Sequence, residues 1–245
     1  MTGRPTGSSL PGVAIAAGGL LALAVVRARL QAGGVPAVPL SAGYGLAILA
    51  LAGLAASRTT AVPRRRASGS QPIPAETAPT AAPGGRTPVT PGAVLRAPVG
   101  ELWRTPTRVP DRRERDALLL GVLLGLALLL PGALLLLSGA IPRGAGLAAA
   151  FPGWAGAVLV VATAEEVLIR GVLQPRLATT AGAESAIVAC ALLFAAIHVP
   201  LYGVQALPLD LGAGLLIGWL RQRTGSVAAC AAAHLVADLG GWFLP

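Results

Sequence analysis

Long stretches without charged side chains constrain this fold more than any other feature. Asp, Glu, Lys and Arg are absent from five segments, and a sixth contains a single acid, Asp238. Apolar stretches of about 18 or more residues are long enough to cross the hydrocarbon core of a bilayer as helices. The sequence therefore predicts an all-α, polytopic transmembrane helix bundle, and it excludes secreted disulfide scaffolds, coiled coils and soluble α/β enzymes. The six segments are residues 5–26, 30–57, 117–142, 144–164, 185–209 and 224–245.

The apolar segments predict about seven spans in three domains. Residues 1–57 contain two N-terminal transmembrane spans that are rich in Ala and Gly. Residues 58–115 are rich in Pro, Thr and Arg, and such a composition buries too little apolar surface to offset chain entropy. We therefore expect them to form a disordered cytoplasmic linker, whereas residues 116–245 contain the last five spans and the catalytic core. The predicted spans fall near 10–26, 36–56, 117–138, 148–170, 185–200, 204–220 and 226–244.

The net charge of +9 reflects 19 basic residues, all of which are Arg. They lie beside apolar spans, where basic loops indicate the cytoplasmic side of a membrane rather than nucleic-acid binding. We therefore expect a multi-pass protein of the cell membrane with a cytoplasmic N-terminus, the lipid bilayer as a partner and no nucleic acid. Cys190 and Cys230 lie inside apolar stretches, so no disulfide framework is predicted.

Seven ionisable side chains lie within the last five predicted spans, and both histidines of the chain are among them. Such groups are costly within a membrane and usually mark a functional site. A less specific interpretation is open for each residue alone, because a charge at a helix end can reach the lipid headgroups and a buried histidine can simply pack. The seven residues are Glu165, Glu166, Arg170, His198, Asp210, His234 and Asp238.

Helical spacing gives these groups different surroundings. Glu166 and Arg170 are i,i+4 neighbours, whereas Glu165 points about 100° away from Glu166. Arg170 can therefore neutralise one carboxylate and leave the other free. His234 and Asp238 are also one helical turn apart, so the carboxylate can accept the ring proton and orient the imidazole.

Glu165, His198 and His234 lie on three different predicted spans, which can converge in one bundle. A carboxylate in a low-dielectric pocket can take a proton from water while imidazoles stabilise the developing oxyanion. The same three residues can instead hold a divalent metal such as zinc, with water as the fourth ligand. The spacing leaves both chemistries open, so the cofactor is either such a metal or none.

Three short motifs resemble those of the CPBP family of intramembrane proteases, which includes type II CaaX prenyl endopeptidases and bacteriocin-immunity-type, Abi-like proteins. EEVLIRG (165–171) is similar to the family's EExxxR motif, FAAIH (194–198) to its FxxxH motif and HLVAD (234–238) to its Hxxx(N/D) motif. They occur in the family's order on successive apolar segments. The resemblance covers roughly 117–245, so the first two spans and the linker look like an addition.

The resemblance implies a CaaX-protease-like membrane endopeptidase that uses glutamate-dependent or metalloprotease chemistry. It makes Glu165 the water-activating carboxylate. It makes His198 and His234 the catalytic or oxyanion-stabilising partners, with Glu166 and Arg170 in support.

Asp238 departs from the Asn that many family members carry at this position. Asn can donate a hydrogen bond to an oxyanion, whereas an ionised Asp cannot. We therefore expect Asp238 either to orient His234 or to lie protonated near Glu165.

The leading prediction is an intramembrane endopeptidase that hydrolyses a peptide bond of a membrane-associated protein or peptide, with its site open toward the cytoplasm. The alternative is a non-catalytic membrane binding, immunity or scaffold protein that uses the same polar cluster for helix packing or proton sensing. A proton-coupled transporter is a weaker third class, because the sequence shows no internal repeat.

The predicted spans bring one conflict with this site. Glu165 lies near the cytoplasmic end of its span, and His198 lies near the opposite end of the next one. The two can meet only if residues 171–184 are re-entrant or if the span ends are shifted. Pro131 predicts an interruption of the third span, and Pro175 predicts a helix end or kink.

Overall fold

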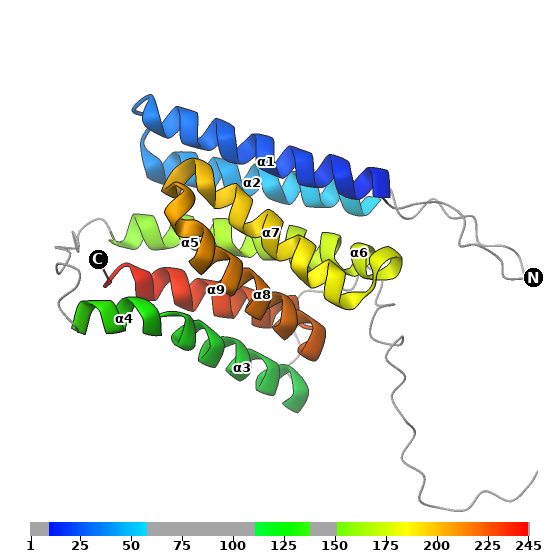
Figure 1. The fold of residues 1–245 in the computed structure, drawn as a ribbon. Helices are drawn as coiled ribbons and strands as arrows, with labels where there is room; N and C mark the ends of the chain where they lie inside the picture. Colours follow the sequence, from blue (N-terminus) through cyan, green and yellow to red (C-terminus); the bar gives the residue numbers. More distant parts are fainter. Residues whose placement is uncertain (1–9, 58–110, 138–150, 245) are drawn as a thin grey trace, which may run out of the picture.

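The structure, a computed structural model, describes residues 10–57, 111–137 and 151–244. These residues contain helices and no strand, as expected for an all-α bundle. The helices, which lie roughly along a common direction in Figure 1, are α1 (Leu10–Ala32), α2 (Ala37–Ser57), α3 (Arg112–Leu128), α4 (Leu130–Leu137), α5 (Phe151–Glu166), the π-helix η4 (Val167–Leu173), α6 (Gln174–Ala181), α7 (Ala183–Tyr202), the 3-10 turn η5 (Val204–Ala206), α8 (Leu207–Thr224) and α9 (Val227–Gly241).

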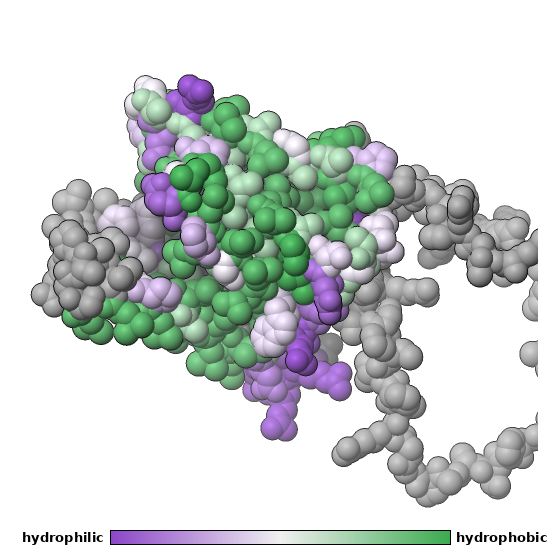
Figure 2. Space-filling view, viewed as in Figure 1, coloured by the Kyte–Doolittle hydropathy of each residue, from purple (hydrophilic) through white to green (hydrophobic). Residues whose placement is uncertain are grey.

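The described helices form seven helical passages. Only Leu129 separates α3 from α4, two residues before Pro131, and α5, η4 and α6 follow one another without a break. Four of the passages are long and apolar enough to cross a membrane, and α9 is a shorter apolar helix. Hydrophobic residues cover most of the face shown in Figure 2, while hydrophilic ones gather near the start of α3. The predicted transmembrane helix bundle is confirmed, and the protein is a multi-pass membrane protein.

The helices pack side by side around a common centre, and the α2–α5 and α3–α9 pairs run parallel. The α1–α2 hairpin lies on α5 and α7, α7 packs against α8, and α3 packs against α9. On α3, Gly121 and Gly125 allow this close approach, because a Cβ at either position would collide with the backbone carbonyl of Ala229 or Ala233 on α9. Small residues commonly line such helix interfaces in membranes.

Of the predicted linker, only residues 111–115 lie among the described residues. Residues 58–110 lie outside the described residues. Asp111 caps the start of α3 by accepting a hydrogen bond from the backbone of Glu114, whose side chain accepts one from the backbone of Asp111. Residues 112–115 therefore belong to a helix with a capping box, and not to a linker.

The fourth predicted span does not end at Arg170, because its helix continues through η4 and α6 to Ala181. Gly182, with φ of 86°, then turns the chain into α7, and glycine adopts this left-handed conformation without steric cost. Glu165 lies 17 residues before this turn (182 − 165) and His198 lies 16 residues after it (198 − 182). The two residues therefore stand at the same level of an antiparallel helix pair, and no re-entrant segment is needed.

The π-helix ends two residues before Pro175. The backbone N–H of Gln174 bonds the carbonyl of Ile169, five residues earlier. The next donor in this pattern would come from residue 175 to the Arg170 carbonyl, but proline has no N–H. Arg221 of α8 fills this position, since its Nε donates to the Arg170 carbonyl at 3.0 Å. The predicted break at Pro175 is thus a change of helix type within one continuous helix.

Candidate active site

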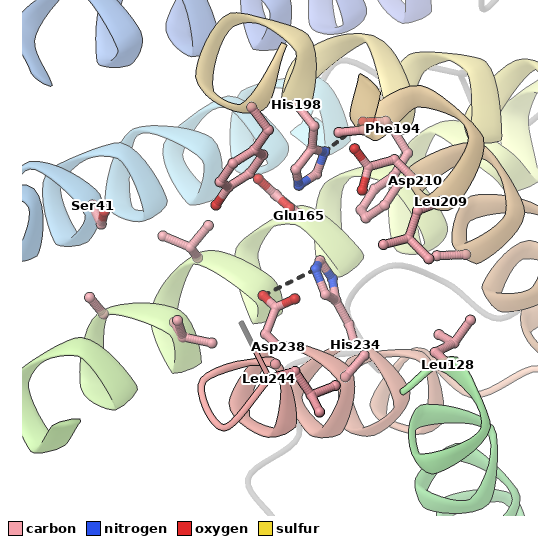
Figure 3. A pocket seen from close by; sticks show the side chains of 18 of the residues that line it. Ser41, Leu128, Glu165, Phe194, His198, Leu209, Asp210, His234, Asp238 and Leu244 are labelled. Carbon is pink, nitrogen blue, oxygen red and sulfur yellow. Dashed lines mark hydrogen bonds and ion pairs between the residues drawn. The ribbon is translucent and has the colours of Figure 1, made fainter. Parts of the chain in front are cut away.

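A cavity of about 650 Å³ lies between the helices and is lined by residues of α1, α2, α5, α7, α8 and α9, with a few from α3 and α4. On α5, α7 and α9 its lining reaches from mid-helix to Trp154, Tyr202 and Gly241. In Figure 3 the side chains of Glu165 (α5), His198 (α7) and Asp210 (α8) point into it, as do those of His234 and Asp238 (α9). The structure thus brings together the predicted water-activating carboxylate and both histidines.

Arg170, Glu166 and His234 form a buried polar network beside the cavity. The Arg170 guanidinium is fully buried, and its Nη1 donates to Glu166 Oε1 at 3.0 Å while its Nη2 donates to the Gly214 carbonyl at 3.2 Å. The same Glu166 oxygen lies 3.0 Å from Nδ1 of His234. The predicted Glu166–Arg170 pair is confirmed. Through Glu166 of α5, this pair also holds the ring of His234 on α9 in place.

Glu165 is the carboxylate that this network leaves out. Its side chain lines the cavity, and it is only 2% exposed to solvent. Of the two adjacent carboxylates, Glu166 is the one that pairs with Arg170. The angle of about 100° between neighbouring helical positions therefore separates a bound carboxylate from one that faces the cavity.

His198 presents one ring nitrogen to the cavity. Its Nδ1 lies 2.7 Å from the carbonyl of Phe194, one turn earlier in α7, and a carbonyl can only accept. Nδ1 therefore carries the proton, which leaves Nε2 free for a water or a substrate atom. The ring also stacks on Tyr202, with the planes 16° apart.

Phe194, the first residue of the FAAIH motif, packs against three members of the site. Its ring centroid lies 4.6 Å from that of His198 and 5.2 Å from that of His234, and 4.8 Å from the Arg170 guanidinium carbon. The aromatic ring thus fixes the spacing between the two imidazoles.

The two aspartates occupy different positions. Asp238 Oδ2 lies 3.5 Å from Nε2 of His234, and its side chain is 41% exposed. Glu166 contacts His234 at a shorter distance, so it orients the ring more firmly than the predicted partner Asp238 does. Asp210, at the start of α8, also lines the cavity, and its Oδ2 is buried without a hydrogen-bond partner. Asp210 was predicted as an intramembrane charge without a role. It is the only Asp, Glu, Lys or Arg between positions 185 and 220 of the sequence.

Two polar residues of the N-terminal hairpin also line the cavity and were missed by sequence reasoning. Arg27 of α1 donates through Nη2 to the hydroxyl of Ser41 on α2 at 3.0 Å. The first span was predicted to end at position 26, which left Arg27 outside it. In the structure the helix continues to Ala32 and includes Arg27. The hairpin thus forms part of the cavity wall.

The predicted metal ligands do not fit a metal ion in this arrangement. Among the described residues, no three His, Cys, Asp or Glu side chains are grouped so that they could hold one. Nδ1 of His234 is engaged by Glu166 Oε1 at 3.0 Å, while Nε2 lies 3.5 Å from Asp238 Oδ2.

Comparison with known proteins agrees with the motifs. Residues 147–240 match the family model described as type II CAAX prenyl endopeptidase Rce1-like. No curated protein and no solved structure matches the chain. The matched segment contains Glu165, His198, His234 and all three motifs. This segment of 94 residues (240 − 147 + 1) is thus similar to a protease family of the kind that the three motifs resemble.

Proposed function

We propose that this protein is an intramembrane endopeptidase that hydrolyses a peptide bond of a membrane-associated protein or peptide with water activated by Glu165. The observation that carries the proposal is the division of labour between neighbouring carboxylates. Glu166 is neutralised by Arg170 and holds His234, while Glu165 faces a cavity that also contains both imidazoles. A carboxylate that forms no ion pair among the described residues, beside two imidazoles in a cavity, suits general-base catalysis.

The proposed reaction needs only groups that line the cavity. Glu165 takes a proton from water as the water oxygen bonds to the scissile carbonyl carbon. His198 and His234 in their protonated forms donate hydrogen bonds to the oxyanion that develops. The C–N bond then breaks, and the proton held by Glu165 passes to the leaving amine. Each step balances without a metal, and none is routed through one.

Asp238 has a separate proposed role. At 3.5 Å from Nε2 of His234 it can steady the ring from the side opposite to Glu166. An ionised carboxylate cannot donate to an oxyanion, so stabilisation of the oxyanion is left to the imidazoles.

A second function is favoured by one observation. The Glu166–Arg170–His234 network connects α5, η4 and α9, and Arg170 reaches the α8 carbonyl of Gly214. A network of this kind can specify helix packing in a protein that binds a partner without cleaving it. In such a protein, loss of the Glu165 carboxylate would leave the function intact.

The test compares protein N-termini across the membrane proteome of the native host expressing wild type or Glu165→Gln at matched levels. We expect N-termini that appear with wild type and are absent with the variant. Glu184→Gln is the matched control, because Glu184 is an exposed acid at the start of α7 that does not line the cavity. Identical N-termini for wild type and a folded Glu165→Gln protein would contradict the peptidase and favour the binding protein.

A further inference from the structure

Among the described residues that line the cavity, Arg27 is the only arginine or lysine. Arg27 lines the same cavity as Glu165, and it comes from α1, outside the segment that matches the family. Its guanidinium carbon lies 4.9 Å from the ring centroid of Tyr44, and its Nη2 donates to Ser41. The aromatic face and the hydroxyl hold the guanidinium in a fixed orientation.

The hydrogen-bonding capacity of Arg27 is only partly used. Its Nε is buried and has no hydrogen-bond partner, and within the described part of the chain no carboxylate forms an ion pair with it. A guanidinium is charged at any physiological pH, and an uncompensated charge in a membrane interior is costly. The fully buried Arg170, by contrast, forms an ion pair with Glu166. Glu165 acts on Arg27 only at a longer range than an ion pair.

The geometry points to an anion-binding site formed by Arg27 and Ser41, in which the N-terminal hairpin holds an oxyanion of a molecule that enters the cavity. A planar guanidinium beside a hydroxyl suits the oxygens of a carboxylate or a phosphate. The oxyanion can come from a substrate peptide, in which case the inference rests on the proposed peptidase function, or from the headgroup of a bound lipid. Either source gives the hairpin a direct part in what the cavity accepts.

The first experiment measures binding separately from cleavage. The probe is a tetra-alanine peptide with an N-terminal dodecanoyl chain, prepared with a free C-terminal carboxylate or as its amide, and the protein is the full chain carrying Glu165→Gln in detergent. We expect the carboxylate form to bind roughly ten- to a hundredfold more tightly than the amide, the gain typical of a hydrogen bond to a charged group. Arg27→Gln should abolish this preference. Arg29→Gln is the matched control, because Arg29 is an exposed arginine of the same helix that does not line the cavity.

The second experiment tests the lipid source. Wild type, Arg27→Gln and Arg29→Gln are purified from vesicles of phosphatidylcholine and phosphatidylglycerol, and the retained lipids are measured by mass spectrometry. Equal binding of the two peptides, with phosphatidylglycerol lost from Arg27→Gln alone, assigns the oxyanion to a lipid. No difference between Arg27→Gln and Arg29→Gln in either experiment overturns the site.

Two further results test the anion-binding site independently of the proposed peptidase activity. If Glu165→Gln leaves cellular N-termini unchanged while the carboxylate preference persists, the peptidase fails and the anion site stands. If the Arg27→Gln protein does not fold, Ser41→Ala replaces it, and we then expect a reduced preference for the carboxylate form. An unchanged preference in a folded Ser41→Ala protein counts against the site.

Discussion

At the scale of single residues, the site depends on two identical neighbours in different surroundings. Glu165 and Glu166 are both buried, yet only Glu166 has cationic and imidazole partners at 3.0 Å. One position along a helix changes the direction of a side chain by about 100°. The same carboxylate chemistry therefore serves structure at one position and, in our proposal, catalysis at the next.

Substitution of the two glutamates should separate these roles. Glu165→Gln is expected to lower hydrolysis by roughly 10²- to 10⁴-fold, the contribution of a general base, with little change in stability. Glu166→Gln leaves Arg170 buried without its carboxylate, which costs about 3–5 kcal/mol of stability. Thermal unfolding in detergent and cleavage of a substrate found by the N-terminus comparison would measure both. A Glu166→Gln protein as stable as wild type would show that the ion pair has no structural role.

At the scale of helices, sequence predicted the all-α bundle and its seven passages, but not the geometry between them. Charge-free length and i,i+4 spacing are local properties, so the seven passages and the Glu166–Arg170 pair could be read directly. The π-helix could not, because it includes the Arg170 carbonyl, to which Pro175 has no N–H to donate and to which Arg221 of another helix donates instead. Without it, the span appeared to end at Arg170, and Glu165 appeared to lie at the wrong level.

The bond from Arg221 predicts a positioning role for this residue. Arg221→Gln removes the charged donor from the Arg170 carbonyl, so amides of η4 should exchange hydrogen faster and kcat should fall severalfold at unchanged KM. Arg223→Gln is the control, since Arg223 is exposed and its guanidinium carbon lies 5.4 Å from the ring centroid of Trp219. Equal exchange rates in both variants would rule out this role.

The α3–α9 contact gives a prediction about packing. In Gly125→Leu the new side chain would meet the Val236 side chain, where even a Cβ would approach to 2.6 Å, and overpacking typically costs about 1–3 kcal/mol. We expect a lower unfolding temperature and a displaced His234, which lies beside the same contact. Gly156→Ala on α5 meets nothing within 4 Å and should be neutral or stabilising. The two melting curves check both statements.

At the scale of the whole molecule, the two ends of the bundle differ in chemistry. One end carries the start of α3 and the ends of α6 and α8, with Arg112, Arg113, Arg115, Arg176, Arg221 and Arg223. The other end carries Phe151, Trp154, Trp242 and Phe243, whose neighbouring ring centroids lie 4.5–5.9 Å apart. Basic residues mark the cytoplasmic side and aromatic clusters mark membrane interfaces. The cavity extends toward the aromatic end, so we now expect it to open away from the cytoplasm, in contrast to the cytoplasmic opening expected from the sequence.

This orientation can be tested by labelling in intact cells. In a background of Cys190→Ala and Cys230→Ala, which removes both buried cysteines, Arg29→Cys should react with a membrane-impermeant maleimide added outside. Arg223→Cys should react only after the cells are permeabilised. The reverse pattern would place the basic end outside and restore a cytoplasmic opening.

The π-helix also changes how this chain can tolerate a lost residue. A turn closed by an i→i+5 bond holds one residue more than an ordinary α-helical turn. Deletion of a residue from a regular helix rotates everything beyond it by about 100°, which would separate catalytic groups on either side. Within Val167–Leu173, a deletion would instead convert the π-turn to an α-turn and leave α5 and α6 facing as they do now. The helix that carries Glu165 therefore holds one residue that its register does not need.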